Sequence, residues 1–81
     1  MPLSKDNLRG MVENKIKKAY IELHRRKVLH GDVRASNILV SSDESIYIID
    51  FEAARIESQT FLKNEMSDVK RLLEKVKNEI K

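Results

Sequence analysis

Two carboxylates and one carboxamide lie at spacings that suit divalent-metal and phosphoryl-transfer chemistry. Asp32 and Asn37 are five residues apart, and Asp50 follows Asn37 by thirteen. Carboxylate and amide oxygens are hard ligands of the kind that Mg²⁺ prefers. In phosphoryl transfer the protein mostly positions groups and supplies electrostatic stabilisation. One such aspartate alone would be typical of any polar turn, so it is the combination that indicates a site.

The surrounding sequence predicts a helix, a loop, a hairpin and a second helix. Residues 5–27 have one apolar stripe at helical spacing, residues 28–37 form a loop, and residues 38–50 contain two β-branched runs around a five-residue polar turn. Apolar residues recur at spacings of four and three within residues 61–80, which predicts the second helix. The fold class expected is α+β, as one small domain spanning residues 1–81.

Single residues indicate where the first helix begins and where the two hairpin strands start and end. Ser4 is expected to cap the first helix, with Gly10 inside it at some cost in stability. Asn37 leads into one hairpin strand and Asp50 closes the other. Antiparallel neighbours of this kind present both side chains at one end of the hairpin, beside the loop that carries Asp32.

The motifs resemble those of the kinase-like phosphotransferase superfamily. Residues 30–37 read H-G-D-V-R-A-S-N, similar to the kinase catalytic loop H-R-D-x-x-x-x-N, and residues 50–52 read D-F-E in place of D-F-G. The resemblance covers almost the full chain, as the core of a protein-kinase-like C-terminal lobe. The H-G-D and D-F-E variants are more similar to choline and aminoglycoside kinases and to small atypical protein kinases of the tRNA-modification complex type.

The resemblance implies a role for each polar residue of the loop and hairpin. Asp32 would accept or orient the proton of an attacking hydroxyl, while Asn37 and Asp50 would hold the Mg²⁺ that bridges the phosphates of ATP. Arg34 would neutralise the transferred phosphate, or would form a surface ion pair. Glu52 would add a carboxylate to the metal site, or would be an exposed strand-end residue.

Two further residues are assigned supporting positions by the same resemblance. His30 would pack beneath the loop, and Asp68 would brace the catalytic-loop backbone from the start of the second helix. Lys27 stands where glycine is common in the family, so the turn there is expected to differ, because a left-handed lysine is costly. A zinc site from His24, His30 and Asp32 lacks a standard ligand spacing.

The two glycines of the chain, Gly10 and Gly31, do not form a glycine-rich phosphate loop. The expectation is therefore a minimal or truncated phosphotransferase that lacks the N-terminal nucleotide lobe and binds nucleotide weakly. Two alternatives stay open. One is a non-catalytic protein-interaction module derived from a kinase fold, and the other is a second chain that supplies the missing lobe.

The composition limits which binding partners and which cellular compartment are expected for this protein. The absence of cysteine excludes disulfides and thiolate zinc sites, and no signal peptide or membrane-spanning apolar run is visible, so a cytoplasmic protein with no membrane partner is expected. Four scattered aromatics do not favour nucleic-acid binding. The apolar stripe of the second helix predicts self-association or a protein partner through residues 62–80, unless the two helices pack antiparallel and cover it. Its members are Leu62, Met66, Val69, Leu73, Val76 and Ile80.

Overall fold

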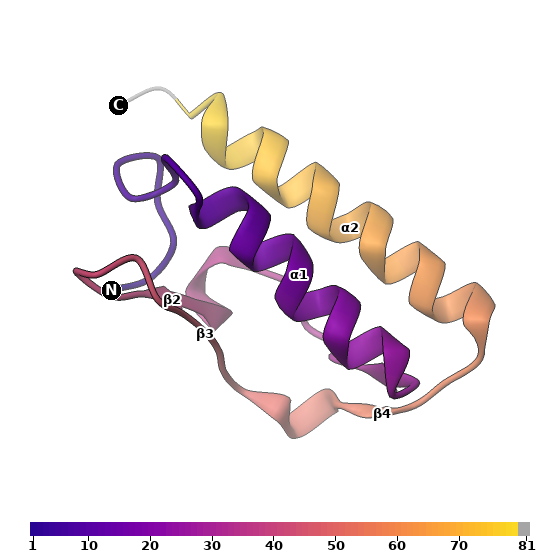
Figure 1. The fold of residues 1–81 in the computed structure, drawn as a ribbon. Coiled ribbons are helices and arrows are strands. Elements are labelled where there is room, and N and C mark those ends of the chain that lie inside the picture. The colour runs from indigo at the N-terminus through magenta and orange to yellow at the C-terminus, as the bar shows by residue number, and fades with distance from the viewer. Residues whose placement is uncertain (80–81) are drawn as a thin grey trace.

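The computed structural model describes residues 1–79, in which two long helices lie side by side next to two small β-ribbons (Figure 1). The helices are α1 (Val12–Arg25) and α2 (Gln59–Lys77). One antiparallel ribbon pairs β2 (Ile38–Val40) with β3 (Ile46–Ile48), and the other pairs β1 (Val28–Leu29) with β4 (Arg55–Ile56). Short 3-10 helices, η1 (Ala35–Asn37) and η2 (Phe51–Ala53), adjoin them. The predicted α+β fold class is confirmed.

The apolar stripe of α2 is covered by α1. Leu62, Val69, Leu73 and Val76 are buried, and the facing α1 stripe is buried as well. Two pairs at opposite ends hold the helices antiparallel: Lys77 Nζ lies 2.8 Å from the Glu13 carboxylate, and His24 Nε2 lies 2.8 Å from that of Glu65. The two helices therefore pack antiparallel and cover these four members of the stripe, and self-association or a protein partner through residues 62–80 stays a prediction. The helix ends at Lys77, and Ile80 lies outside the described residues.

The first helix begins seven residues later than predicted. Residues before it pair with the hairpin instead: the Leu3 N–H donates to the Ile38 carbonyl at 2.8 Å, and the Val40 N–H donates to the Met1 carbonyl at 2.7 Å. The chain must then turn before entering α1, and Gly10 supplies that turn with a left-handed φ of +59°. Ser4 is consequently not the cap, since α1 follows Met11 with no side-chain cap.

The β2–β3 hairpin has the predicted strands and turn, with Leu39 opposite Tyr47 in the register. The β1–β4 ribbon was not predicted, because β1 lies in the expected loop and β4 in a segment without strand pattern. Lys27, contrary to expectation, does adopt the left-handed conformation, with φ of +63°. Its N–H donates to the His24 carbonyl at 2.9 Å, and its carbonyl accepts from the Glu57 N–H at 3.1 Å, so this residue joins the end of α1 to the ribbon. Within residues 1–79 we find no helix with the length and apolar content needed to cross a bilayer.

Candidate active site

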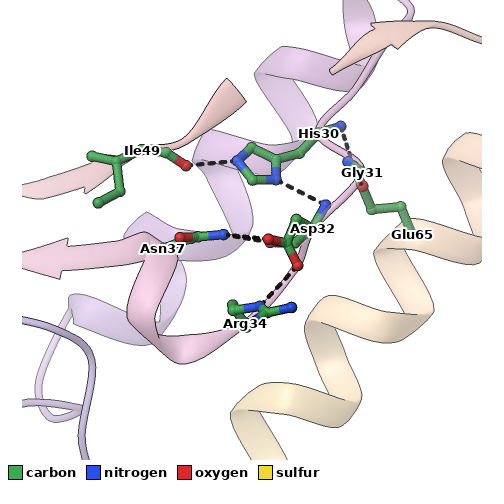
Figure 2. Close-up of polar contacts among 7 residues, drawn as sticks. All are labelled: His30, Gly31, Asp32, Arg34, Asn37, Ile49 and Glu65. Atoms are coloured by element: carbon green, nitrogen blue, oxygen red, sulfur yellow. Dashed lines mark hydrogen bonds and ion pairs between the residues drawn. The ribbon is translucent and has the colours of Figure 1, made fainter. Parts of the chain in front are cut away.

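Glu65 on α2 holds the backbone of the loop that carries Asp32. One carboxylate oxygen accepts the His30 N–H at 2.9 Å, and the other accepts the Gly31 N–H at 2.8 Å (Figure 2). The first oxygen also lies 2.8 Å from His24 Nε2. Burial of this side chain, only 4% exposed, acts to raise the pKa of Glu65. The hydrogen bonds from Gly31, His24 and His30 outweigh burial and lower the pKa overall, so the carboxylate is ionised at neutral pH. An ionised carboxylate only accepts, so His24 Nε2 carries a proton.

His30 joins the loop to the strand that precedes Asp50. The fully buried ring contacts the Ile49 carbonyl through Nε2 at 2.8 Å and accepts the Asp32 N–H at Nδ1 at 3.2 Å. A carbonyl can only accept and an amide N–H can only donate, so His30 is the neutral tautomer protonated at Nε2. The Phe51 ring packs edge-on against it at 4.8 Å between centroids. His30 therefore lies beneath the loop as a supporting residue, not at the surface as a base.

Asp32, Arg34 and Asn37 are brought together by the turn of the loop. Asn37 Nδ2 donates to the Asp32 backbone carbonyl at 2.9 Å and to its carboxylate at 3.1 Å, and Arg34 Nε donates to the other carboxylate oxygen at 2.8 Å. Asn37 is buried, whereas 32% of the Asp32 side chain and 64% of the Arg34 side chain are exposed. Arg34 was expected either to neutralise a transferred phosphate or to form a surface ion pair, and the structure contains the ion pair, with Asp32.

Asp50 leads out of the hairpin directly after the residue that pairs with Asn37. The Ile49 N–H donates to the Asn37 carbonyl at 2.9 Å, and Asp50 is the next residue along the chain. Asp50 is exposed and has a left-handed backbone, with φ of +61° and ψ of 70°. This conformation is uncommon for a residue other than glycine and occurs preferentially at functional positions.

The donor atoms at this end of the hairpin fit a hard cation. The Asn37 amide nitrogen is used by Asp32, and Figure 2 shows its oxygen turned away from that residue. An amide oxygen and one carboxylate, with phosphate oxygens and water, form a set that Mg²⁺ accepts. Within residues 1–79 no three His, Cys, Asp or Glu side chains are grouped closely enough to hold a metal. Glu52 is exposed on η2 and therefore does not form a preorganised carboxylate metal site with Asp32 and Asp50.

Gly31 is required by the segment that follows Asp50. Its φ is +91°, and a Cβ added there would lie 2.5 Å from the Ala53 carbonyl oxygen. No side chain fits at that distance, so the H-G-D sequence is explained by the close approach of η2 to the loop. This contact also places η2 directly against the residue that Glu65 holds.

Asp68 does not take the bracing position that the resemblance implied. Its carboxylate is more than half exposed and lies 3.5 Å from the Arg71 guanidinium, whereas the loop amides bond to Glu65, three residues earlier in α2. The sequence did contain a signal for Glu65, which lies three residues after Leu62 and four before Val69. A carboxylate at that spacing is on the buried face of the helix, where a charge needs partners.

A model of the lipopolysaccharide kinase (Kdo/WaaP) family matches residues 3–80. The chain belongs to this family. Stretches of this chain also match short parts of larger proteins. It is 38% identical over 42 residues to a probable serine/threonine-protein kinase, mkcF, of Dictyostelium discoideum, covering 52% of this chain and 6% of that protein. It is 46% identical over 39 residues to a stress-activated protein kinase JNK of Suberites domuncula, covering 48% and 11%.

A third relative, a probable SapB synthase of Streptomyces coelicolor, is 40% identical over 43 residues, covering 53% of this chain and 4% of that protein. The chain thus spans about a tenth or less of the length of these curated relatives. Membership of the Kdo/WaaP family confirms the kinase-like phosphotransferase superfamily. Kinase families use ATP and Mg²⁺ in general.

Proposed function

We propose that this chain carries the catalytic-loop and metal-binding half of an ATP-dependent phosphotransferase. The observation that supports the proposal is the contact between Asp32 and Asn37 at the end of the hairpin from which Asp50 leads out. The Asn37 side-chain amide donates to Asp32, and its backbone carbonyl accepts the N–H of Ile49, the residue before Asp50, so one buried residue connects the candidate base to the strand that ends at the candidate metal ligand.

In this proposal Asp32 orients the attacking hydroxyl and accepts its proton. Bonds to Arg34 and Asn37 fix the carboxylate in one orientation, and each oxygen keeps a further acceptor position for a substrate hydroxyl. Arg34 is half of an exposed pair and can turn toward a transferring phosphate at small cost, because exposed ion pairs contribute only about 0–1 kcal/mol.

Asn37 and Asp50 would hold Mg²⁺ through the amide oxygen and the carboxylate. When bound, the ion neutralises phosphate charge and fixes the phosphate chain. His30 and Glu65 position the loop, since they hold the backbone on both sides of Gly31 and keep Asp32 beside Asn37. Glu52 is a further candidate ligand for a metal that arrives with nucleotide.

Turnover by these 81 residues alone is expected to be negligible. Neither Gly10, in the turn before α1, nor Gly31, against Ala53, belongs to a glycine-rich cover for phosphate. Positioning of the reacting groups lowers the activation free energy of such reactions by roughly 7–11 kcal/mol, so a site with only half of its groups is expected to lose most of the rate. Robust ATP consumption that Asp32→Ala and Asp50→Ala abolish would contradict this expectation.

The family name makes a saccharide hydroxyl of lipopolysaccharide the first acceptor to try, and the kinase relatives make a protein hydroxyl the second. A non-catalytic interaction module remains the second candidate function. The observation that favours it is the Arg34–Asp32 pair, which occupies one oxygen of the proposed base.

ATP affinity measured with and without Mg²⁺ distinguishes the two functions. For a metal–phosphate site, Mg²⁺ strengthens ATP binding in the wild type and not in Asp50→Asn. Asp43→Asn is the matched control, because Asp43 is an exposed carboxylate in the turn at the other end of the same hairpin. Affinity that is independent of Mg²⁺, or equally affected by both variants, would refute the phosphotransferase proposal.

A further inference from the structure

A groove separates the end of α1 from the start of α2, away from the loop that carries Asp32. Its volume is about 440 Å³, within the range of sites that bind ligands. It lies between the two helix ends that the His24–Glu65 pair joins. The lining residues are Ile21, His24, Arg25, Lys27, Gln59, Leu62, Lys63 and Met66.

The groove combines an apolar floor with a cationic rim. Ile21, Leu62 and Met66 supply the apolar surface, and Ile21 is 48% exposed although it is a large aliphatic residue. Arg25, Lys27 and Lys63 supply the charge, and no acidic side chain is part of the lining.

The rim charges are mostly uncompensated. Arg25 pairs with Glu22 at 3.0 Å, in a pair that is largely exposed to solvent. Lys27 and Lys63 form no ion pair with any acidic side chain among residues 1–79. Charge complementarity therefore favours an anionic occupant that also carries apolar groups.

We propose that this groove binds an acidic peptide segment of a protein partner, anchored by apolar side chains. The accessible apolar lining is exposed Ile21 on α1 and half-buried Met66 on α2, whereas Leu62 is only 2% exposed, so an apolar side chain that projects from a peptide can contact both helices. An amphipathic segment laid into a groove between helices is a common mode of peptide recognition, and Met66 provides an adaptable contact. Because His24 lines the groove and bonds Glu65, which in turn accepts the loop amides, two hydrogen bonds would connect the groove to the loop that carries Asp32.

Selection from an unbiased peptide library displayed on phage tests the proposal, with the full chain as target. The enriched peptides should combine Asp or Glu with Leu, Phe or Met. A synthetic copy of the best peptide, followed by fluorescence anisotropy, should bind Lys63→Glu about tenfold or more weakly than the wild type. Lys70→Glu is the matched control, because it makes the same charge change at an exposed position of α2 outside the groove, and should bind as the wild type does.

Three results would overturn the proposal: a selection that yields no peptide, one that yields peptides without acidic residues, and equal binding by Lys63→Glu and Lys70→Glu. Vesicles of phosphatidylcholine and phosphatidylserine test the other anionic surface. Vesicle binding that Lys63→Glu abolishes, without acidic-peptide binding, would assign the groove to a lipid headgroup and equally refute a peptide site. Circular dichroism of both variants verifies that each remains folded.

Discussion

Replacing Glu65 with alanine should destabilise the protein severely, because three donors lose their acceptor at once. The His30 and Gly31 N–H groups and the His24 ring nitrogen all bond this carboxylate, which is 4% exposed. A buried donor left without a partner costs about 1–3 kcal/mol. The two backbone donors and the ring together predict a loss of about 3–9 kcal/mol in the free energy of unfolding.

That loss is large for a protein of this size. At about 0.05–0.15 kcal/mol per residue, this chain is expected to have roughly 4–12 kcal/mol of stability in total. Urea unfolding followed by circular dichroism should show the midpoint of Glu65→Ala lower by roughly 2 M or more, or no folded baseline. Glu65→Gln keeps one acceptor oxygen but turns an amide NH₂ toward a donor, so its loss should be about 1–3 kcal/mol.

Asp68→Ala is the matched control, one turn further along α2. Its carboxylate is 56% exposed and pairs with the exposed Arg71, so the change should cost less than about 1 kcal/mol. Equal losses for Asp68→Ala and Glu65→Ala, or a loss below about 1 kcal/mol for Glu65→Ala, would refute the bracing role of Glu65.

The same carboxylate makes stability depend on pH in a defined direction. The folded pKa of Glu65 is lower than its ordinary value of 4.5, since the hydrogen bonds from the loop outweigh burial. A lowered pKa contributes stability that is fully present above the unfolded pKa and is lost as pH falls through the folded pKa. The urea midpoint should therefore fall below about pH 4.5 more steeply in the wild type than in Glu65→Gln. Parallel curves for the two proteins would contradict this.

Three single substitutions test the local backbone and core. Gly31→Ala should lower the free energy of unfolding, measured in urea, by about 2–4 kcal/mol, because φ is +91° there and the new Cβ would lie 2.5 Å from the Ala53 oxygen. A change below about 0.5 kcal/mol would show that the contact is absent. Lys27→Gly should raise the free energy of unfolding by about 0.5–1 kcal/mol and the melting temperature by a few degrees, since φ is +63° there. A lower melting temperature would argue against the left-handed turn. Tyr20→Phe should raise the free energy of unfolding by about 1 kcal/mol, because the buried hydroxyl has no hydrogen-bond partner among residues 1–79. A decrease of similar size would mean that the hydroxyl is hydrogen-bonded in solution.

The elements that the sequence predicts well are those whose pattern is local. The hairpin follows from two β-branched runs around a polar turn, and α2 follows from its apolar spacing, because each signal lies within a few residues. The start of α1 depends on a distant contact instead. Leu3 pairs with Ile38, which forces a turn at Gly10 and shortens the helix, and helical periodicity carries no information on that pairing.

The β1–β4 ribbon was missed for a related reason. Each strand has two residues, with Val28 opposite Ile56, and two residues are too few to show alternation. For the candidate site, the spacing of Asp32 and Asn37 is matched by the bonds between them, whereas a shared metal site with Asp50 stays a prediction. The motif resemblance points to Asp68 as the brace, but the helical phase places Glu65 inside and Asp68 outside.

Paramagnetic Mn²⁺ used in place of Mg²⁺ locates the metal directly. With ATP and the ¹⁵N-labelled protein, line broadening in NMR spectra should begin at the amides of Asn37 and Asp50 and extend to Asp32. It should disappear in Asp50→Asn and persist in Asp43→Asn. Broadening centred on the turn at Asp43, or on α2, or unchanged in Asp50→Asn, would contradict a metal–phosphate site at the open end of the hairpin.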